Sequence, residues 1–216
     1  MEVGTCFFHT LIEQAGETTK GISIEPIKKY QDMLPDKSNV IKVNAALVSE
    51  EDFGDGSIDI YYVHDDIIRE HQLGAWLAGC NSVNKPHDFH LKYYPDPEEW
   101  HSTKDKSKLK YNIVNIFDKG LVSVDKVKCI TFKNLVDQCE IDYIKYLKVD
   151  VEGYDCKIVN SVLDYFSSYE KCPDKILFES NTHSSKKEII DLMKRLRQLG
   201  YDLINTEFDT IANKRK

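Results

Sequence analysis

The residues best suited to chemistry lie in residues 146–155, which read YLKVDVEGYD. Apolar and polar residues alternate here, so an extended strand would place Lys148, Asp150 and Glu152 on one side. Gly153 then allows the backbone to turn sharply or to approach a ligand closely. Because ligands of open α/β sheets bind beyond the carboxyl ends of parallel strands, Asp150 and Glu152 are predicted to face a ligand. The alternative is a buried strand whose terminal carboxylates are merely solvated.

Glu179 ends a second apolar run, KILFE at residues 175–179, and would join Asp150 and Glu152 if the two strands are neighbours. These three carboxylates are the candidate catalytic residues. Asp150 is the first candidate for a base that removes a proton from a reacting hydroxyl. The three carboxylates could instead hold a divalent cation, Mg²⁺ or Mn²⁺, that acidifies the hydroxyl. His183 and His87 are further candidates for the base, although lone histidines are more often surface or core residues.

The elements that must position these residues alternate between strand and helix. Short apolar runs separated by amphipathic segments predict an α/β fold with a mostly parallel, doubly wound sheet and helices on both faces. A helix at residues 186–199 and an antiparallel hairpin at residues 201–214 end the chain. The predicted strands are residues 2–5, 21–24, 39–48, 58–63, 127–132, 143–151 and 175–179.

Residues 1–216 are predicted to form one domain, interrupted by an irregular insertion at about residues 64–125. Within the insertion, residues 84–110 show little periodicity but contain several aromatic residues. Because long connections in compact domains are usually functional or disordered, we expect this segment to form a lid or an acceptor-binding loop.

Composition excludes several classes of protein. The net charge of −7 argues against a nucleic-acid-binding protein, which needs a basic face. None of the six cysteines forms a CxxC pair or a zinc-site spacing, which favours reduced thiols and a cytoplasmic protein. No apolar stretch approaches the length of a membrane span, and no partner membrane is predicted. The sequence does not indicate an oligomeric state.

The order of these segments resembles the Rossmann-like class I S-adenosylmethionine-dependent methyltransferase fold, in which an α/β chain ends in a helix and a hairpin. LKVDVEG in particular is similar to the signature of the FkbM family, most of whose members are O-methyltransferases. Other segments fall in the family's order: EVGT in place of its D-x-G turn, SIEP after the second strand, NAAL after the third and KILFES after the fifth. The family's second glycine is missing after EVG, where Thr5 and Cys6 follow Gly4.

This resemblance implies a binding site for S-adenosylmethionine. Glu2 is expected to accept a hydrogen bond from the cofactor ammonium group, and Gly4 to let the backbone approach the cofactor. Glu25, at the end of the second strand, is expected to bind both ribose hydroxyls. A purely structural alternative for Glu25 is a carboxylate at the start of the next helix. The same segments assign four further residues to the cofactor site: Thr5, Pro26, Asn44 and Ala45.

The resemblance therefore predicts an O-methyltransferase acting on a small hydroxylated acceptor, with a sugar or glycan as the most typical substrate. The missing glycine motivates an alternative, a catalytically silent domain used as a binding or assembly module. A third interpretation, an enzyme using NAD or a sugar nucleotide, is disfavoured because the sequence contains no G-x-G-x-x-G motif.

Overall fold

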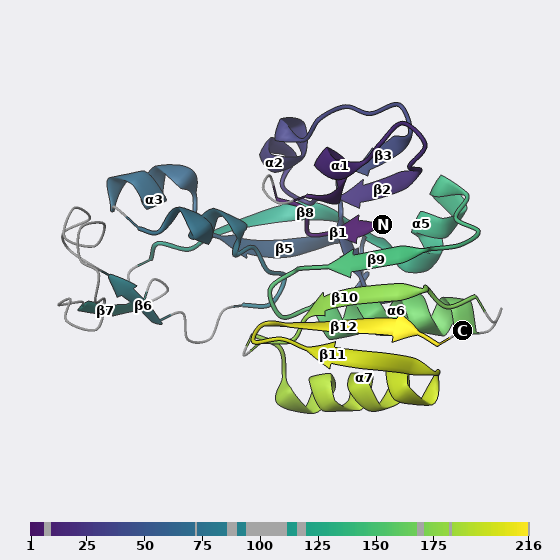
Figure 1. Ribbon diagram of the computed structural model, residues 1–216. Helices are drawn as coiled ribbons and strands as arrows, with labels where there is room; N and C mark the ends of the chain where they lie inside the picture. Colours follow the sequence, from purple (N-terminus) through teal and green to yellow (C-terminus); the bar gives the residue numbers. More distant parts are fainter. Residues whose placement is uncertain are drawn as a thin grey trace.

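A seven-stranded, mostly parallel sheet forms the centre of the computed structural model (Figure 1). Its strand order is β11-β12-β10-β9-β1-β2-β3. The five strands from β10 to β3 are parallel to one another, and antiparallel β12 separates β10 from β11. Their bounds are Glu2–Val3 (β1), Gly21–Ile24 (β2), Val40–Val43 (β3), Tyr146–Val149 (β9), Lys175–Glu179 (β10), Tyr201–Asn205 (β11) and Asp209–Lys214 (β12). The structure describes residues 1–6, 10–71, 73–85, 90–93, 112–115, 120–167, 171–181 and 183–215.

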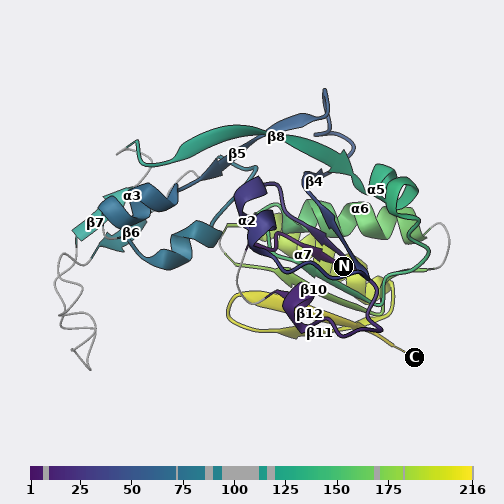
Figure 2. The same cartoon turned by 90° about the horizontal axis from the view of Figure 1, so that it is seen from above.

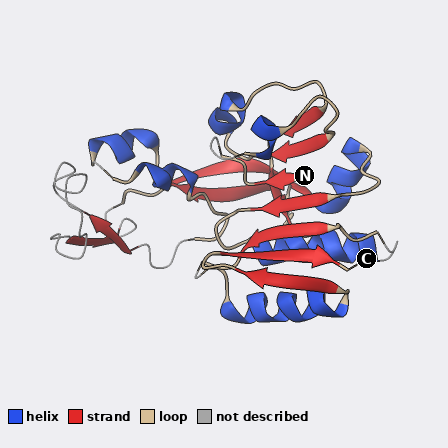
Figure 3. Cartoon of the chain, viewed as in Figure 1, coloured by secondary structure: helices blue, strands red, loops and turns tan. Residues whose placement is uncertain are grey.

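The parallel strands place their carboxyl ends at one edge of the sheet, as the sequence predicts. β9 lies between β1 and β10, so the segments that follow these three strands are neighbours. The predicted α/β architecture with a C-terminal helix and hairpin is confirmed (Figure 3).

One face of this sheet carries the main hydrophobic core. Leu147 and Val149 of β9 are fully buried, and Ile176 and Phe178 of β10 lie beside them at 0% exposure. Three helices pack on this side: α5 (Phe132–Cys139), α6 (Asp155–Ser167) and α7 (Lys186–Gln198) (Figure 2). α6 contributes an apolar stripe at helical spacing, which consists of Ile158, Val159, Val162 and Leu163.

The opposite face carries the short helix α1 (Leu11–Gln14), which begins at a capping box between Thr10 and Glu13. Helix α2 (Lys28–Met33) follows β2. Its Tyr30 is buried in a second, smaller apolar cluster that also contains Cys6 and Leu77.

A second sheet with the order β4-β8-β5 stands beside the first (Figure 2). Its strands are β4 (Ala46–Val48), β5 (Ser57–Tyr62) and β8 (Ser123–Thr131). The prediction of one continuous strand over residues 39–48 is therefore wrong. The amide of Asn44 donates to the carbonyl oxygens of Glu25 and Pro26 at 2.9 and 3.0 Å, which ends β3 and turns the chain toward the second sheet.

Several short elements lie within the insertion predicted at residues 64–125. Helix α3 (Asp65–Glu70), the 3₁₀ helix η1 (Ala75–Gly79) and the antiparallel pair β6 (His90–Tyr93) and β7 (Asn112–Asn115) belong to it. β8 begins at Ser123, inside the limits predicted for the insertion. Most of the predicted lid at residues 84–110, including His87, lies outside the described residues.

None of the helices in the described part of the chain is long and apolar enough to cross a membrane. None of the six cysteines forms a disulfide.

Candidate functional site

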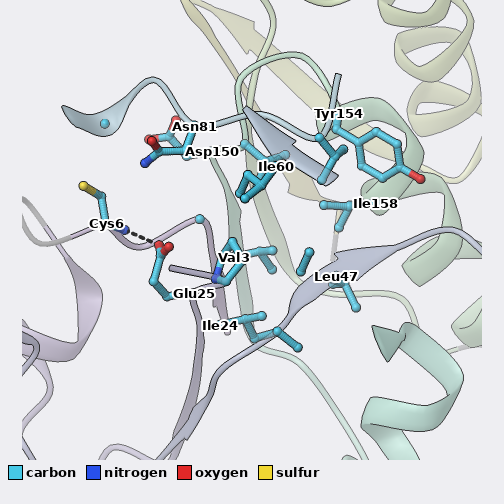
Figure 4. A pocket seen from close by; sticks show the side chains of 17 residues that line it. Val3, Cys6, Ile24, Glu25, Leu47, Ile60, Asn81, Asp150, Tyr154 and Ile158 are labelled. Atoms are coloured by element: carbon cyan, nitrogen blue, oxygen red, sulfur yellow. Dashed lines mark hydrogen bonds between the residues drawn. The ribbon is translucent and has the colours of Figure 1, made fainter. Parts of the chain in front are cut away.

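A cavity opens at the carboxyl edge of the sheet, where β1, β2 and β9 end (Figure 4). The lining residues surround about 480 Å³ of space, which includes open solvent. Five of the predicted site residues line it: Gly4, Glu25, Pro26, Ala45 and Asp150. Polar groups gather at one end of the cavity, and the side chains of Leu47 and Ile158 lie at the other.

Glu25 is the most buried acidic group of this cavity, with 2% of its surface exposed. Its carboxylate accepts hydrogen bonds from the backbone N–H of Cys6 at 2.7 Å and of Ile27 at 2.9 Å. Ile27 is the N-cap residue of α2, so the structural role considered for Glu25 is present. Burial raises the pKa of Glu25 to about 7, although both hydrogen bonds favour the ionised form. A carboxylate has about four acceptor positions, so these backbone bonds do not use all of them.

Gly4 has φ +74°, in the left-handed region that glycine tolerates. A Cβ atom here would overlap the carbonyl oxygen of Asp150 and lie 2.8 Å from Val151 Cγ1. The close approach predicted for Gly4 is therefore an approach to the backbone that follows β9. It brings the ends of β1 and β9 together and forms one wall of the cavity.

Three predicted cofactor ligands do not line the cavity. Glu2 is 2% exposed, accepts a hydrogen bond from the backbone N–H of Leu11 at 2.8 Å and pairs with Lys148 at 3.0 Å. Thr5 donates a hydrogen bond to the carbonyl oxygen of Ile24. The side-chain amide of Asn44 donates to the carbonyl oxygens of Glu25 and Pro26, directly after β2. These side chains shape the loops around the cavity rather than facing it.

Asp150 reaches the cavity directly after β9. Its side chain is 46% exposed and lies 3.8 Å from the ammonium of Lys148. Crowding by the surrounding protein, with a smaller contribution from Glu152, raises the pKa of Asp150 to about 6. The predicted contact of Asp150 with a ligand stays a prediction.

Glu152 and Glu179 lie together beside this cavity rather than in its lining, and they form a cluster with His183. Glu152 Oε2 and His183 Nδ1 are 2.6 Å apart, and this hydrogen bond raises the pKa of His183. Burial and the nearby Glu152, Asp155 and Asp150 raise the pKa of Glu179 to about 10. The crowded negative charge disfavours the ionised form of Glu179 unless a cation is bound, which argues against Glu179 as a general base.

Asp155 was given no role by the sequence but is central to this edge. It is fully buried, and its carboxylate accepts hydrogen bonds from the backbone N–H of Gly153 at 3.2 Å and of Glu179 at 3.3 Å. Burial, followed by the charge of Asp150, raises its pKa to about 7. The available sequence signal was an acidic residue in the first turn of α6, where the helix dipole favours it.

Two further contacts hold the turn after β9. Ser82 donates to the carbonyl oxygen of Glu152 at 2.7 Å, and the amide of Asn84 donates to the carbonyl oxygen of Gly153 at 3.0 Å. Tyr154, which lines the cavity, donates its hydroxyl hydrogen bond to Asp52. No sequence pattern indicated these contacts, because each joins segments that are far apart in the chain.

Comparison with protein-family models, with curated proteins and with solved structures finds no match.

Proposed function

We propose that the protein is an S-adenosylmethionine-dependent O-methyltransferase acting on a small hydroxylated acceptor, with sugars and glycans as the favoured class. One observation carries the proposal: Glu25 and Asp150, which end different strands, face one cavity at the carboxyl edge of a parallel sheet. The helix and hairpin that end the chain add support, since the resemblance to class I methyltransferases rests partly on them.

The residues around the cavity fit the chemistry of this cofactor. Apolar walls that include Pro26, Ala45 and Leu47 suit an adenine ring. The remaining acceptor capacity of Glu25 suits a ribose hydroxyl. Asp150 supplies a negative charge, which favours a sulfonium cation.

The loop after β1 has a backbone conformation that glycine adopts readily. Cys6, in the stretch where the FkbM family has its second glycine, has φ +44°. Its backbone N–H points to Glu25 rather than to open solvent. Cys6 therefore has a left-handed backbone conformation of the kind that glycine adopts readily.

S-adenosylmethionine, when bound, supplies an activated methyl group for in-line displacement. The protein must then hold the acceptor hydroxyl in line and accept its proton. Asp150 is the only predicted catalytic carboxylate that lines the cavity in the described part of the chain, so we assign proton acceptance to its carboxylate oxygen. Lys148, at 3.8 Å, helps to keep that carboxylate ionised.

A second candidate function is a binding module without catalysis. It is favoured by the hydrogen bonds that Glu25 accepts from the backbone N–H groups of Cys6 and Ile27. A carboxylate that is already hydrogen-bonded within the protein needs no ligand. Binding of the cofactor without methyl transfer to any acceptor would support this candidate.

The proposal is tested by transfer of a labelled methyl group to a panel of monosaccharides and glycosides. Asp150→Asn keeps the shape and removes the base, so turnover should fall by about 100-fold or more. Cofactor affinity should change by only a few-fold. Asp59→Asn, at an exposed position of β5, is the matched control and should keep full activity. Wild-type turnover in the Asp150→Asn variant would refute the assignment of the base.

A further inference from the structure

Glu152, Glu179 and His183 form a compact set of ligand atoms. One donor atom from each residue lies within 4.8 Å of the other two. The three come from different segments: the turn after β9, the end of β10 and the loop before α7. In the described part of the chain, no other group of three such side chains meets this geometry.

Glu179 provides an independent sign that a ligand is missing from this cluster. Its Oε2 atom is shielded from solvent and has no hydrogen-bond partner among the described residues. An orphaned buried acceptor is costly and is uncommon in folded proteins. Asp150 and Asp155 add negative charge around it. A cation satisfies both the orphaned oxygen and the surrounding charge.

The cluster is also held in place by other groups. Asn181 donates from Nδ2 to Glu179 Oε1 at 2.5 Å and accepts at Oδ1 from the backbone N–H of His183 at 2.8 Å. Gly153 packs so closely against His183 that an added Cβ would lie 2.9 Å from its carbonyl carbon. Such supporting contacts orient the ligands of metal sites.

We propose that Glu152, Glu179 and His183 bind one divalent transition-metal ion, of which Mn²⁺ and Zn²⁺ are the best candidates. Two carboxylates and an imidazole favour these ions over Mg²⁺ and Ca²⁺, which prefer oxygen ligands alone. Three protein ligands leave at least one coordination position for water or a substrate oxygen. Binding of the ion does not depend on the proposed methyl transfer.

Mn²⁺ is the better probe, because cysteine thiols elsewhere in the chain are soft ligands that could bind Zn²⁺. Loss of the free Mn²⁺ signal in electron paramagnetic resonance measures binding to the full chain without any cofactor or acceptor. We expect the wild type to bind one Mn²⁺ per chain with a micromolar Kd. Glu179→Gln and His183→Ala should each weaken binding at least about tenfold.

His64 provides a matched control. Its Nδ1 also faces a carboxylate, that of Asp66 at 3.3 Å, but this pair belongs to no group of three ligands among the described residues. His64→Ala should therefore leave the Mn²⁺ affinity unchanged. Circular dichroism of each variant separates loss of the site from loss of the fold, and Glu152→Gln replaces any variant that unfolds.

Two results would overturn the metal site. One is a folded wild type that leaves Mn²⁺ free and also fails to bind Zn²⁺ stoichiometrically. The other is equal affinity in the wild type and in folded Glu179→Gln and His183→Ala variants. Methyl transfer without any bound metal would leave the proposed function intact, so the two proposals fail independently.

Discussion

Gly4→Ala offers a sharp test of how the cavity wall is built. An alanine at φ +74° pays about 1–2 kcal/mol for a left-handed conformation. Its Cβ would also overlap the Asp150 carbonyl oxygen, so the ends of β1 and β9 must separate. The hydrogen bonds Gly4 N–H to Ile24 O and Asp150 N–H to Val3 O, both 3.0 Å, flank this contact. Weakening either buried bond adds about 1–3 kcal/mol.

We therefore expect Gly4→Ala to lower the free energy of unfolding by about 2–5 kcal/mol, a large part of the stability of a typical domain. Urea unfolding measures the change. Gly54→Ala is the matched control, because Gly54 has φ +50° but no atom within 4 Å of its added Cβ. That variant should lose only about 1–2 kcal/mol. Equal losses in the two variants would show that β1 and β9 do not approach as described.

Three other predictions concern the same region. The pKa of Glu25 is about 7 in the folded state, above its unfolded value of 4.5. Protonated Glu25 therefore stabilises the fold fully below pH 4.5, and this stabilisation is lost as the pH rises through 7. Between pH 5 and 8, the free energy of unfolding in urea should fall by about 2–3 kcal/mol more in the wild type than in Glu25→Gln. Parallel pH profiles of the two proteins would contradict this. Cys6→Gly should change the free energy of unfolding by less than about 1 kcal/mol. Cys6→Val should destabilise the fold clearly more in the same assay, because a β-branched side chain is strained at φ +44°. Tyr154→Phe removes the hydroxyl that hydrogen-bonds to Asp52 and Ser49, so the free energy of unfolding should fall by about 1–3 kcal/mol in thermal unfolding. Cofactor affinity should not change, because the ring still lines the cavity.

Much of the fold could be predicted from local patterns. The alternation around Leu147 and Val149 correctly separates the buried face of β9 from the polar face. β10 was predicted with its observed bounds, because its central Ile, Leu and Phe residues are apolar and are flanked by polar residues.

Other features could not be read from the chain, because they depend on distant partners. The break between β3 and β4 depends on Asn44, whose amide binds a carbonyl group 19 residues away. The burial of Glu25 also depends on a distant partner, because its carboxylate accepts a hydrogen bond from the backbone N–H of Cys6. The sequence indicated Asp150, Glu152 and Glu179 together, whereas the structure separates Asp150, in the cavity, from the other two, which contact His183.

Calorimetric titration of S-adenosylmethionine into the wild type and Glu25→Gln at pH 8 tests the cofactor site most directly. At this pH Glu25 is mostly ionised, and the glutamine keeps the shape of the side chain. We expect the wild type to bind one S-adenosylmethionine per chain and not NAD, with affinity reduced by about 1–3 kcal/mol in Glu25→Gln. Absence of binding to the folded wild type, equal binding of NAD, or unchanged affinity in Glu25→Gln would contradict the proposed site.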